Sequence, residues 1–85
     1  MHETTFTFSY RTPTRAALVA AALEPEVGAI DGDRTSVALD RRESVLKVTV
    51  DASDAVALRA GQNSWLGLVE VAEDVAAAGR RFDRD

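Results

Sequence analysis

The chain has 85 residues, the size of one small domain, and a domain this small buries only about 60% of the surface that its unfolded form exposes. It contains no cysteine, which excludes disulfides, thiolate metal ligands and cysteine nucleophiles. Ten basic and fourteen acidic residues give a formal net charge of -4, which argues against a dedicated nucleic-acid-binding protein with its usual basic surface.

No segment of the sequence has the length or character of a membrane span or an export signal. The longest apolar run, residues 16–23, is far too short to cross a bilayer. Residues 1–4 lack the basic start and the apolar stretch of a signal peptide. We therefore expect a soluble, cytoplasmic protein without membrane contact. Nine of the ten basic residues are arginine, a bias that a salt-loving host and a GC-rich genome explain equally well.

The first predicted element is a strand over residues 4–10, where polar and aromatic residues alternate. Its aromatic face, which we expect to be buried, carries Phe6, Phe8 and Tyr10. The threonines and serine between them should face water.

A short helix is predicted next, because Thr12 can cap it and Pro13 suits its first turn. It should end near residue 24, since Pro25 follows. Its bulky side, which we expect to face the sheet, carries Leu18, Val19 and Leu23. Its alanine side is either exposed to water or covered by another helix that approaches closely, and it carries Ala16, Ala17, Ala20 and Ala21.

A hairpin follows a loop over residues 26–33, in which Asp31-Gly32-Asp33 predicts a turn. The hairpin strands are predicted over residues 35–39 and 45–52, joined by a polar turn at residues 40–43. Inward positions of the hairpin are expected to be Val37, Leu39, Leu46, Val48, Val50 and Ala52.

A long helix over residues 54–78 ends the predicted fold, with Ser53 as its cap and Gly79 as its terminator. One apolar stripe, suited to packing on a sheet, comprises Leu58, Trp65, Val69, Ala72 and Ala76. A second stripe, which needs cover from the first helix or from another chain, comprises Ala57, Ala60, Leu68, Val71, Val75 and Ala78. Polar residues occupy a narrow strip of Arg59, Asn63, Glu70 and Asp74.

These elements predict an α+β fold of order βαββα, in which two helices pack on one face of a three-stranded antiparallel sheet. We expect a single domain over residues 1–85, with an ordered core over about 4–79 and a flexible tail over 80–85. Exposed strand edges and a small core favour a dimer.

The chain has few side chains that could act in catalysis. His2, the single histidine, lies at the terminus, where it cannot be held as a general base or a metal ligand. Asp31-Gly32-Asp33 fails as a calcium loop, because Arg42 stands where a bidentate glutamate is required. We therefore predict no catalytic residue, no metal and no cofactor. Two clusters of arginine, at 41–42 and 80–84, lie among acidic residues, and Arg41 and Arg42 are weak candidates for an RNA phosphate contact.

The string Leu58-Arg59-Ala60-Gly61-Gln62-Asn63-Ser64-Trp65-Leu66, with Ala22-Leu23-Glu24-Pro25-Glu26 and the βαββα order, resembles the Pcc family. That family provides the small dimerisation subunit of the KEOPS complex, which makes threonylcarbamoyladenosine in tRNA. The resemblance covers roughly residues 5–78. Its most specific pattern falls on Leu58, Arg59, Ala60, Asn63, Ser64 and Leu66.

The resemblance implies a non-catalytic assembly subunit. Family members pair by joining their sheets, as homodimers or with a paralogue, and dock their two helices on the transferase subunit of KEOPS. Contact with tRNA would then be indirect or weak. The residues we predict to bind the partner are Ala17, Ala20, Ala21, Arg59, Asn63, Leu68, Val71 and Val75.

Two other functions fit the predicted fold class. An autonomous KH-like RNA-binding module would share the sheet, but the sequence has no G-x-x-G backbone-clamping loop. A small-ligand regulatory domain is supported by the fold class alone.

Overall fold

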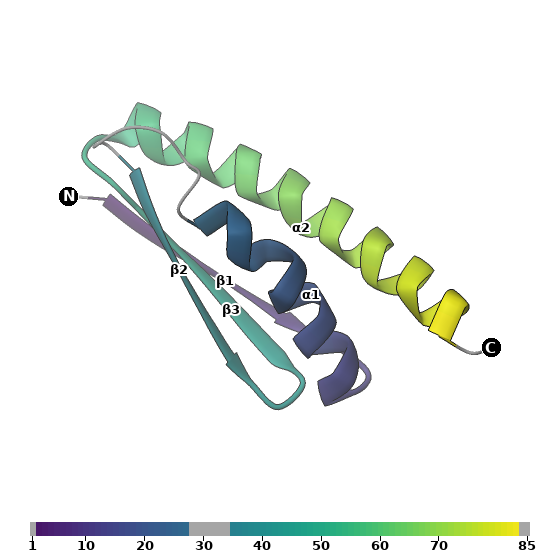
Figure 1. Ribbon diagram of the computed structural model, residues 1–85. Helices are drawn as coiled ribbons and strands as arrows, with labels where there is room; N and C mark the ends of the chain where they lie inside the picture. The colour runs from purple at the N-terminus through teal and green to yellow at the C-terminus, as the bar shows by residue number, and fades with distance from the viewer. Residues whose placement is uncertain (1, 28–34, 84–85) are drawn as a thin grey trace.

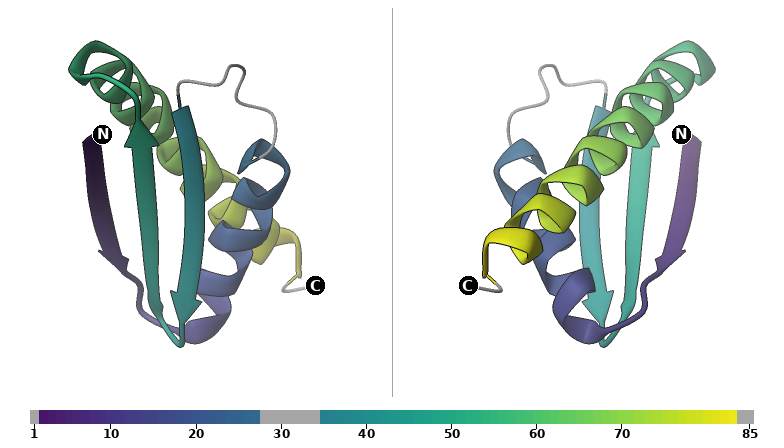
Figure 2. Two further views of the ribbon diagram at one scale, coloured as in Figure 1. Left: turned by 90° about the vertical axis from the view of Figure 1, so that its left-hand side faces the viewer. Right: turned by 90° about the vertical axis from the view of Figure 1, so that its right-hand side faces the viewer.

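The computed structural model describes residues 2–27 and 35–83, with side chains up to residue 78. The elements follow the order β1 (His2–Ser9), α1 (Pro13–Val27), β2 (Thr35–Arg42), β3 (Val45–Ala52) and α2 (Ala55–Asp83). The three strands form one antiparallel sheet in the order β1-β3-β2, and both helices cover the same face of it (Figures 1 and 2). The predicted α+β, βαββα fold is confirmed. The turn predicted at residues 31–33 lies outside the described residues.

Alternation along the strands places the core between the sheet and the helices. The central strand β3 contributes its predicted inward positions, all of them buried: Leu46, Val48, Val50 and Ala52. On β1 the aromatic face is half-buried, and Phe6 stacks on Phe8 with ring centroids 6.4 Å apart. The opposite face of the sheet is polar and carries Thr5, whose hydroxyl lies 3.3 Å from that of Thr49.

The α1 helix begins as its sequence dictates but ends later. The Thr12 hydroxyl accepts a hydrogen bond from the backbone N–H of Arg15 at 3.1 Å, so the predicted cap is confirmed. The prediction that Pro25 stops the helix is wrong, because α1 continues to Val27. Pro25 lies in the last turn and is exposed, so water can bind the carbonyl of Ala21 that loses its N–H partner.

The hairpin is longer than predicted. Strand β2 does not end at Leu39 but continues to Arg42, which pairs with Val45, leaving a loop of two residues. The first loop residue, Glu43, has a φ of 55°. Two-residue hairpins need such left-handed geometry to match the twist of their strands, even when the position is not glycine.

Replacing Glu43 with glycine is expected to stabilise the protein. A left-handed residue with a Cβ costs roughly 1–2 kcal/mol, and glycine removes most of this strain. We expect a gain of about 1 kcal/mol, seen as a rise of about 4–8 °C in melting temperature. The neighbouring Ser44→Gly should give no gain, because Ser44 does not have a positive φ. Equal melting temperatures for both variants would contradict this account of the loop.

The α2 helix differs from prediction at both ends. Its cap is Asp54 rather than Ser53, since the Asp54 carboxylate accepts a hydrogen bond from the N–H of Ala57 at 2.8 Å. The prediction that Gly79 ends the helix is wrong, because α2 runs on to Asp83 and so includes part of the predicted tail. A single glycine costs about 1 kcal/mol in a helix, too little to end it without a left-handed turn.

The length of α2 exceeds that of the sheet. A helix of 29 residues spans roughly 44 Å, whereas a strand of eight residues spans about 27 Å. The molecule measures 47 × 21 × 16 Å, and α2 runs along its long dimension and beyond the sheet (Figure 1). The C-terminal part of this helix therefore has no sheet beneath it.

Candidate functional site

The inner face of α2 packs on the sheet as the sequence predicts. Trp65 is fully buried, and the other members of the first stripe are buried or packed against the core: Leu58, Val69, Ala72 and Ala76. Gly61 lets the helix approach closely, because an added Cβ would lie 3.1 Å from Val50 Cγ1 and 3.2 Å from Thr35 Cγ2. The start of α2 is therefore pressed against β3 and β2.

The outer face of α2 carries a continuous row of small and apolar residues, which we call the outer strip. Its members recur every three or four positions, and all of them are exposed: Ala60, Ser64, Gly67, Val71, Val75 and Ala78. Val71 and Val75 are 59% and 56% exposed, although valine prefers to be buried. A Cβ added at Gly67 would meet no atom within 4 Å, so the middle of the strip is open and flat.

The second predicted stripe divides into two parts. Ala57 and Leu68 are half-buried, and Leu68 packs against the core. Ala60, Val71, Val75 and Ala78 belong to the outer strip. Helix α1 therefore leaves part of this stripe uncovered within the monomer. Sequence reasoning missed Ser64 and Gly67, whose signal was their spacing of three and four from the other members.

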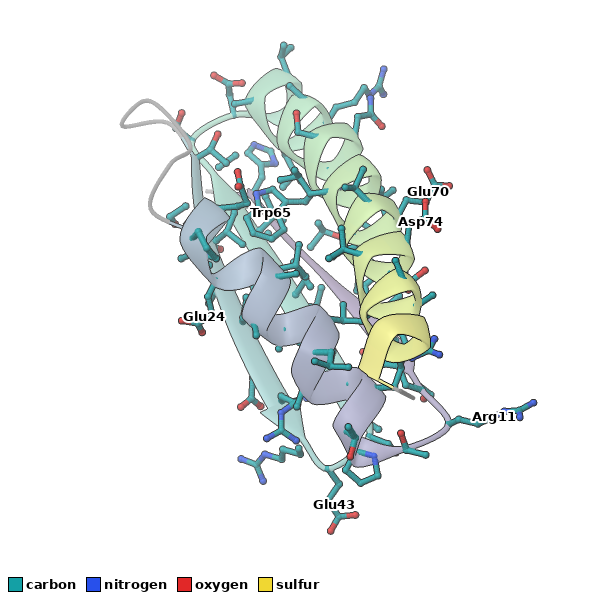
Figure 3. The ribbon with its side chains drawn as sticks, turned by 45° about the vertical axis from the view of Figure 1, so that its right-hand side comes forward. Arg11, Glu24, Glu43, Trp65, Glu70 and Asp74 are labelled. Carbon is teal, nitrogen blue, oxygen red and sulfur yellow. The ribbon has the colours of Figure 1, made fainter. Side chains whose placement is uncertain are left out.

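The polar strip of α2 lies apart from these residues. Arg59, Asn63, Glu70 and Asp74 are all exposed. Figure 3 shows Glu70 and Asp74 projecting from the side of α2 that is turned away from α1. Because the outer strip is rotated by about a quarter turn from these residues, it lies on the outward surface nearer to α1.

The contribution of α1 to this surface is smaller than predicted. Ala16 was expected on the outward alanine side, but it is fully buried in the core. Ala20 is half-buried and packs against the core, and Ala17 is also half-buried. Ala21 alone among these alanines is exposed. The correction follows from helix geometry, because Ala16 lies three residues before the buried Val19 and shares its face.

One hydrogen bond fixes α2 over the end of β1. The Tyr10 hydroxyl donates to Glu73 Oε2 at 2.7 Å. Burial, together with this bond, raises the pKa of Tyr10. Tyr10 also donates its backbone N–H to Ser44 O in the hairpin loop at 2.9 Å. The end of β1, the hairpin loop and the middle of α2 are thereby tied together.

The two edges of the sheet differ in character. Strand β2 ends in Asp40, Arg41 and Arg42, and α1 lies over this side of the sheet (Figure 2). The candidate phosphate contacts Arg41 and Arg42 lie beside the hairpin loop, where Arg42 pairs with Asp40 at 3.5 Å and Arg41 donates to Glu43 O at 2.9 Å. Strand β1 carries no basic residue except His2 and leaves its aromatic face half-buried.

A pair of carboxylates faces water near the start of β1. Glu3 lies opposite Asp51 on β3, and the hydrogen bond that it forms with Asp51 when protonated, reinforced by charge repulsion, raises the pKa of Glu3. A raised pKa means that the folded state holds this proton more tightly than the unfolded chain. The bound proton on Glu3 therefore stabilises the folded state at acidic pH, and this stabilisation is lost as the pH rises through the folded-state pKa of Glu3.

Glu3→Gln is therefore expected to raise the melting temperature at pH 7, where it removes the repulsion with Asp51. The gain should shrink towards zero below about pH 4, where Glu3 of the natural chain is protonated. Thermal unfolding at the two pH values checks this, with the exposed Glu24→Gln on α1 as the matched control. A gain that does not change with pH would exclude the carboxylate pair as its cause.

Two other kinds of site are absent from the part of the chain that the structure describes. None of the described helices is long and apolar enough to span a membrane. Within residues 2–27 and 35–83, no three histidine or carboxylate side chains gather in a way that could hold a metal ion.

Comparison with known protein families shows to which family this chain belongs. The profile of the family described as "Transcription factor Pcc1" matches residues 3–77, which is most of the chain. The chain belongs to the Pcc1 family. The resemblance predicted from the sequence is thus confirmed. The string that carried it lies on the first half of α2, where Arg59, Ala60, Asn63 and Ser64 are exposed.

A solved structure has the same fold as this member of the Pcc1 family. It is described as the crystal structure of the binary complex Gon7-Pcc1, and it is 17% identical with a TM-score of 0.78. The match covers 91% of this chain and 94% of the other. A search of curated proteins gave no match.

Proposed function

We propose that this chain is a non-catalytic assembly subunit of the KEOPS complex, which binds the transferase subunit through α2 and a second small subunit through its sheet. Membership of the Pcc1 family and the fold shared with the Gon7-Pcc1 complex support the assembly role. The observation that carries the docking proposal is the outer strip, an exposed row of small and apolar residues along α2.

The occupant that the outer strip fits best is a helix of the partner. Spacing of three and four residues is the pattern by which one helix packs along another. Small residues in the middle, Ser64 and Gly67, allow a close approach of the two backbones. Val71 and Val75 provide apolar contacts towards the C-terminal end. Ala17, Ala20, Ala21 and Leu68 are expected to flank the partner helix, and Arg59 and Asn63 to contact it from the polar side.

The description of the family as a transcription factor is not favoured by this surface. Among described side chains, Arg59 is the single basic residue on α2, and Glu70 and Asp74 share its strip. A helix that enters a DNA groove normally presents several cations to the phosphates. Carboxylates at these positions would repel them.

The docking is tested by mixing the chain with the purified transferase subunit and analysing the mixture by size-exclusion chromatography. We expect the two proteins to co-elute as a stable complex at micromolar concentration. Separate elution at this concentration would contradict the proposed function.

For the second subunit, we propose that β1 is the edge at which two sheets join. The hairpin closes on the Arg42–Val45 pair, so the even-numbered residues of β3 turn their backbone groups towards β1. By the observed register, the alternate β1 residues turn N–H and C=O outward to an unpaired edge, and these are Glu3, Thr5, Thr7 and Ser9.

A second copy of β1 fits this edge in antiparallel orientation. With the two-fold axis at Phe6, Thr5 pairs with Thr7 of the second copy. The same register pairs Glu3 with Ser9, so the two glutamates stay apart, and it brings the two Phe6 rings together over the half-buried aromatic face. Strand β2 is less suitable, since charged residues at its end are a common device against edge pairing.

A further inference from the structure

A cleft of about 530 Å³ lies at the end of β1, apart from the outer strip. In the proposed pairing of two β1 strands, Glu3 of the second copy lies opposite Ser9 at one margin of this cleft. Its lining consists of Ser9, Tyr10, Arg11 and Arg15. Ser9 ends β1, Tyr10 and Arg11 belong to the connection, and Arg15 comes from the first turn of α1. The sequence interpretation gave no role to any of the polar groups gathered here.

Arg15 has an unusual environment. Its Nε is buried without a hydrogen-bond partner in the structure. A buried donor without a partner is rare in folded proteins and is commonly satisfied by a water molecule or a ligand. A guanidinium that lines a cleft and has an unpaired donor is well suited to a planar pair of oxygen atoms.

Arg11 supplies a second positive charge at the cleft. It is exposed, and in Figure 3 its side chain extends from the connection between β1 and α1 into solvent. No ion pair joins it to a carboxylate within the described residues. A long, unpaired arginine at the rim of a cleft can fold over a bound anion without first breaking another contact.

The wider surroundings are also basic, although the protein is acidic. Four of the six arginine and lysine side chains that the structure describes lie at this end: Arg11, Arg15, Arg41 and Arg42. The hydrogen bond from Tyr10 to Ser44 joins the cleft to the hairpin loop beside Arg41 and Arg42. Three acids lie nearby: Asp40 pairs with Arg42, Glu43 points away from the body in Figure 3, and Glu73 accepts the Tyr10 hydroxyl.

We propose that the cleft binds a phosphate group between the guanidinium groups of Arg11 and Arg15, with the Ser9 hydroxyl as a further donor. The Tyr10 hydroxyl donates its proton to Glu73, so Tyr10 lines the cleft without donating to the phosphate. The phosphate has two sources with the same chemistry, a free or mononucleotide phosphate and the backbone of a single-stranded RNA. Binding here does not require docking on the transferase, so the two proposals can fail separately.

The test is a titration of the ¹⁵N-labelled full chain, followed by NMR, with inorganic phosphate and separately with a short single-stranded RNA. We expect the backbone signals of residues 9–15 and the Nε–H signal of Arg15 to shift. RNA acting at concentrations about 100-fold lower than phosphate would identify RNA as the source, whereas equal concentrations would identify a small phosphate. If neither probe moves these signals, the proposal is wrong.

Variants separate the cleft from general electrostatic attraction. Arg11→Gln and Arg15→Lys are each expected to weaken phosphate binding about tenfold. The first removes a positive charge, and the second keeps the charge but loses the planar pair of N–H donors of the guanidinium group. Arg59→Gln removes the same charge from α2, far from the cleft, and should leave binding unchanged. Equal loss in Arg59→Gln would overturn the site. Arg11 is exposed, so its variant is expected to fold normally, which a thermal melt verifies.

Discussion

Replacing Val71 and Val75 together with glutamate is expected to abolish binding of the transferase subunit. Both residues are more than half exposed in the monomer, so the substitution places two charges in water. In the complex these carboxylates would be buried without a partner, which costs several kcal/mol per ion. Affinity should therefore fall by at least about 100-fold, as measured by calorimetry or chromatography.

The same double variant should fold as well as the natural chain. Glutamate is a better helix former than valine, and neither residue belongs to the core. Ala55→Glu is the matched control, because Ala55 is exposed in the first turn of α2 and lies about 160° around the helix from both Val71 and Val75. Normal binding by the double variant, or an equal loss in the Ala55 control, would show that the outer strip is not the docking surface.

Thr7→Pro is expected to convert a dimer into monomers. In the proposed pairing each Thr7 donates its N–H across the two-fold axis, so proline removes two hydrogen bonds and adds two clashes. A loss of about 3 kcal/mol would raise the dissociation constant of the dimer roughly 100-fold. Within one copy this N–H points away from β3, so the fold should tolerate proline at the edge.

Sedimentation at micromolar concentration measures this effect. The natural chain should sediment at twice its mass of 9.1 kDa and Thr7→Pro at the monomer mass. Thr7→Ala keeps the backbone N–H and should remain dimeric, which separates the hydrogen bond from the side chain. A monomeric natural chain would refute β1 pairing, as would a dimer that survives the proline.

The sequence predicted most of the core because its signals are local and periodic. Alternation in β3 placed four residues inward, and the structure buries all four. The stripe containing Trp65 and Val69 was equally readable, since a helix on a sheet needs one apolar face. The ends of elements were predicted less well. Pro25 lies in an exposed last turn, where water can replace the lost hydrogen bond, and a single glycine such as Gly79 costs too little to end a helix.

Other features could not be read from one sequence, because they depend on contacts between distant segments. The burial of Ala16 depends on how α1 rotates against the sheet, which its uniformly apolar sequence does not specify. The bond between Tyr10 and Glu73 joins residues 63 positions apart. The cleft beside them likewise needs the end of β1 and the start of α1 in their folded positions. The outer strip was only partly predicted, since Ser64 and Gly67 are not apolar by type.

The most direct test of the account is to observe the valine methyl groups while the transferase subunit is added. In a chain labelled with ¹³C at its valine methyl groups, the NMR signals of Val71 and Val75 should shift or broaden at equimolar transferase. Signals of Val45, on the face of the sheet away from the helices, should remain unchanged. A complex that forms without altering Val71 and Val75, or that alters Val45 alone, would contradict the claim that the outer strip is the surface covered by the partner.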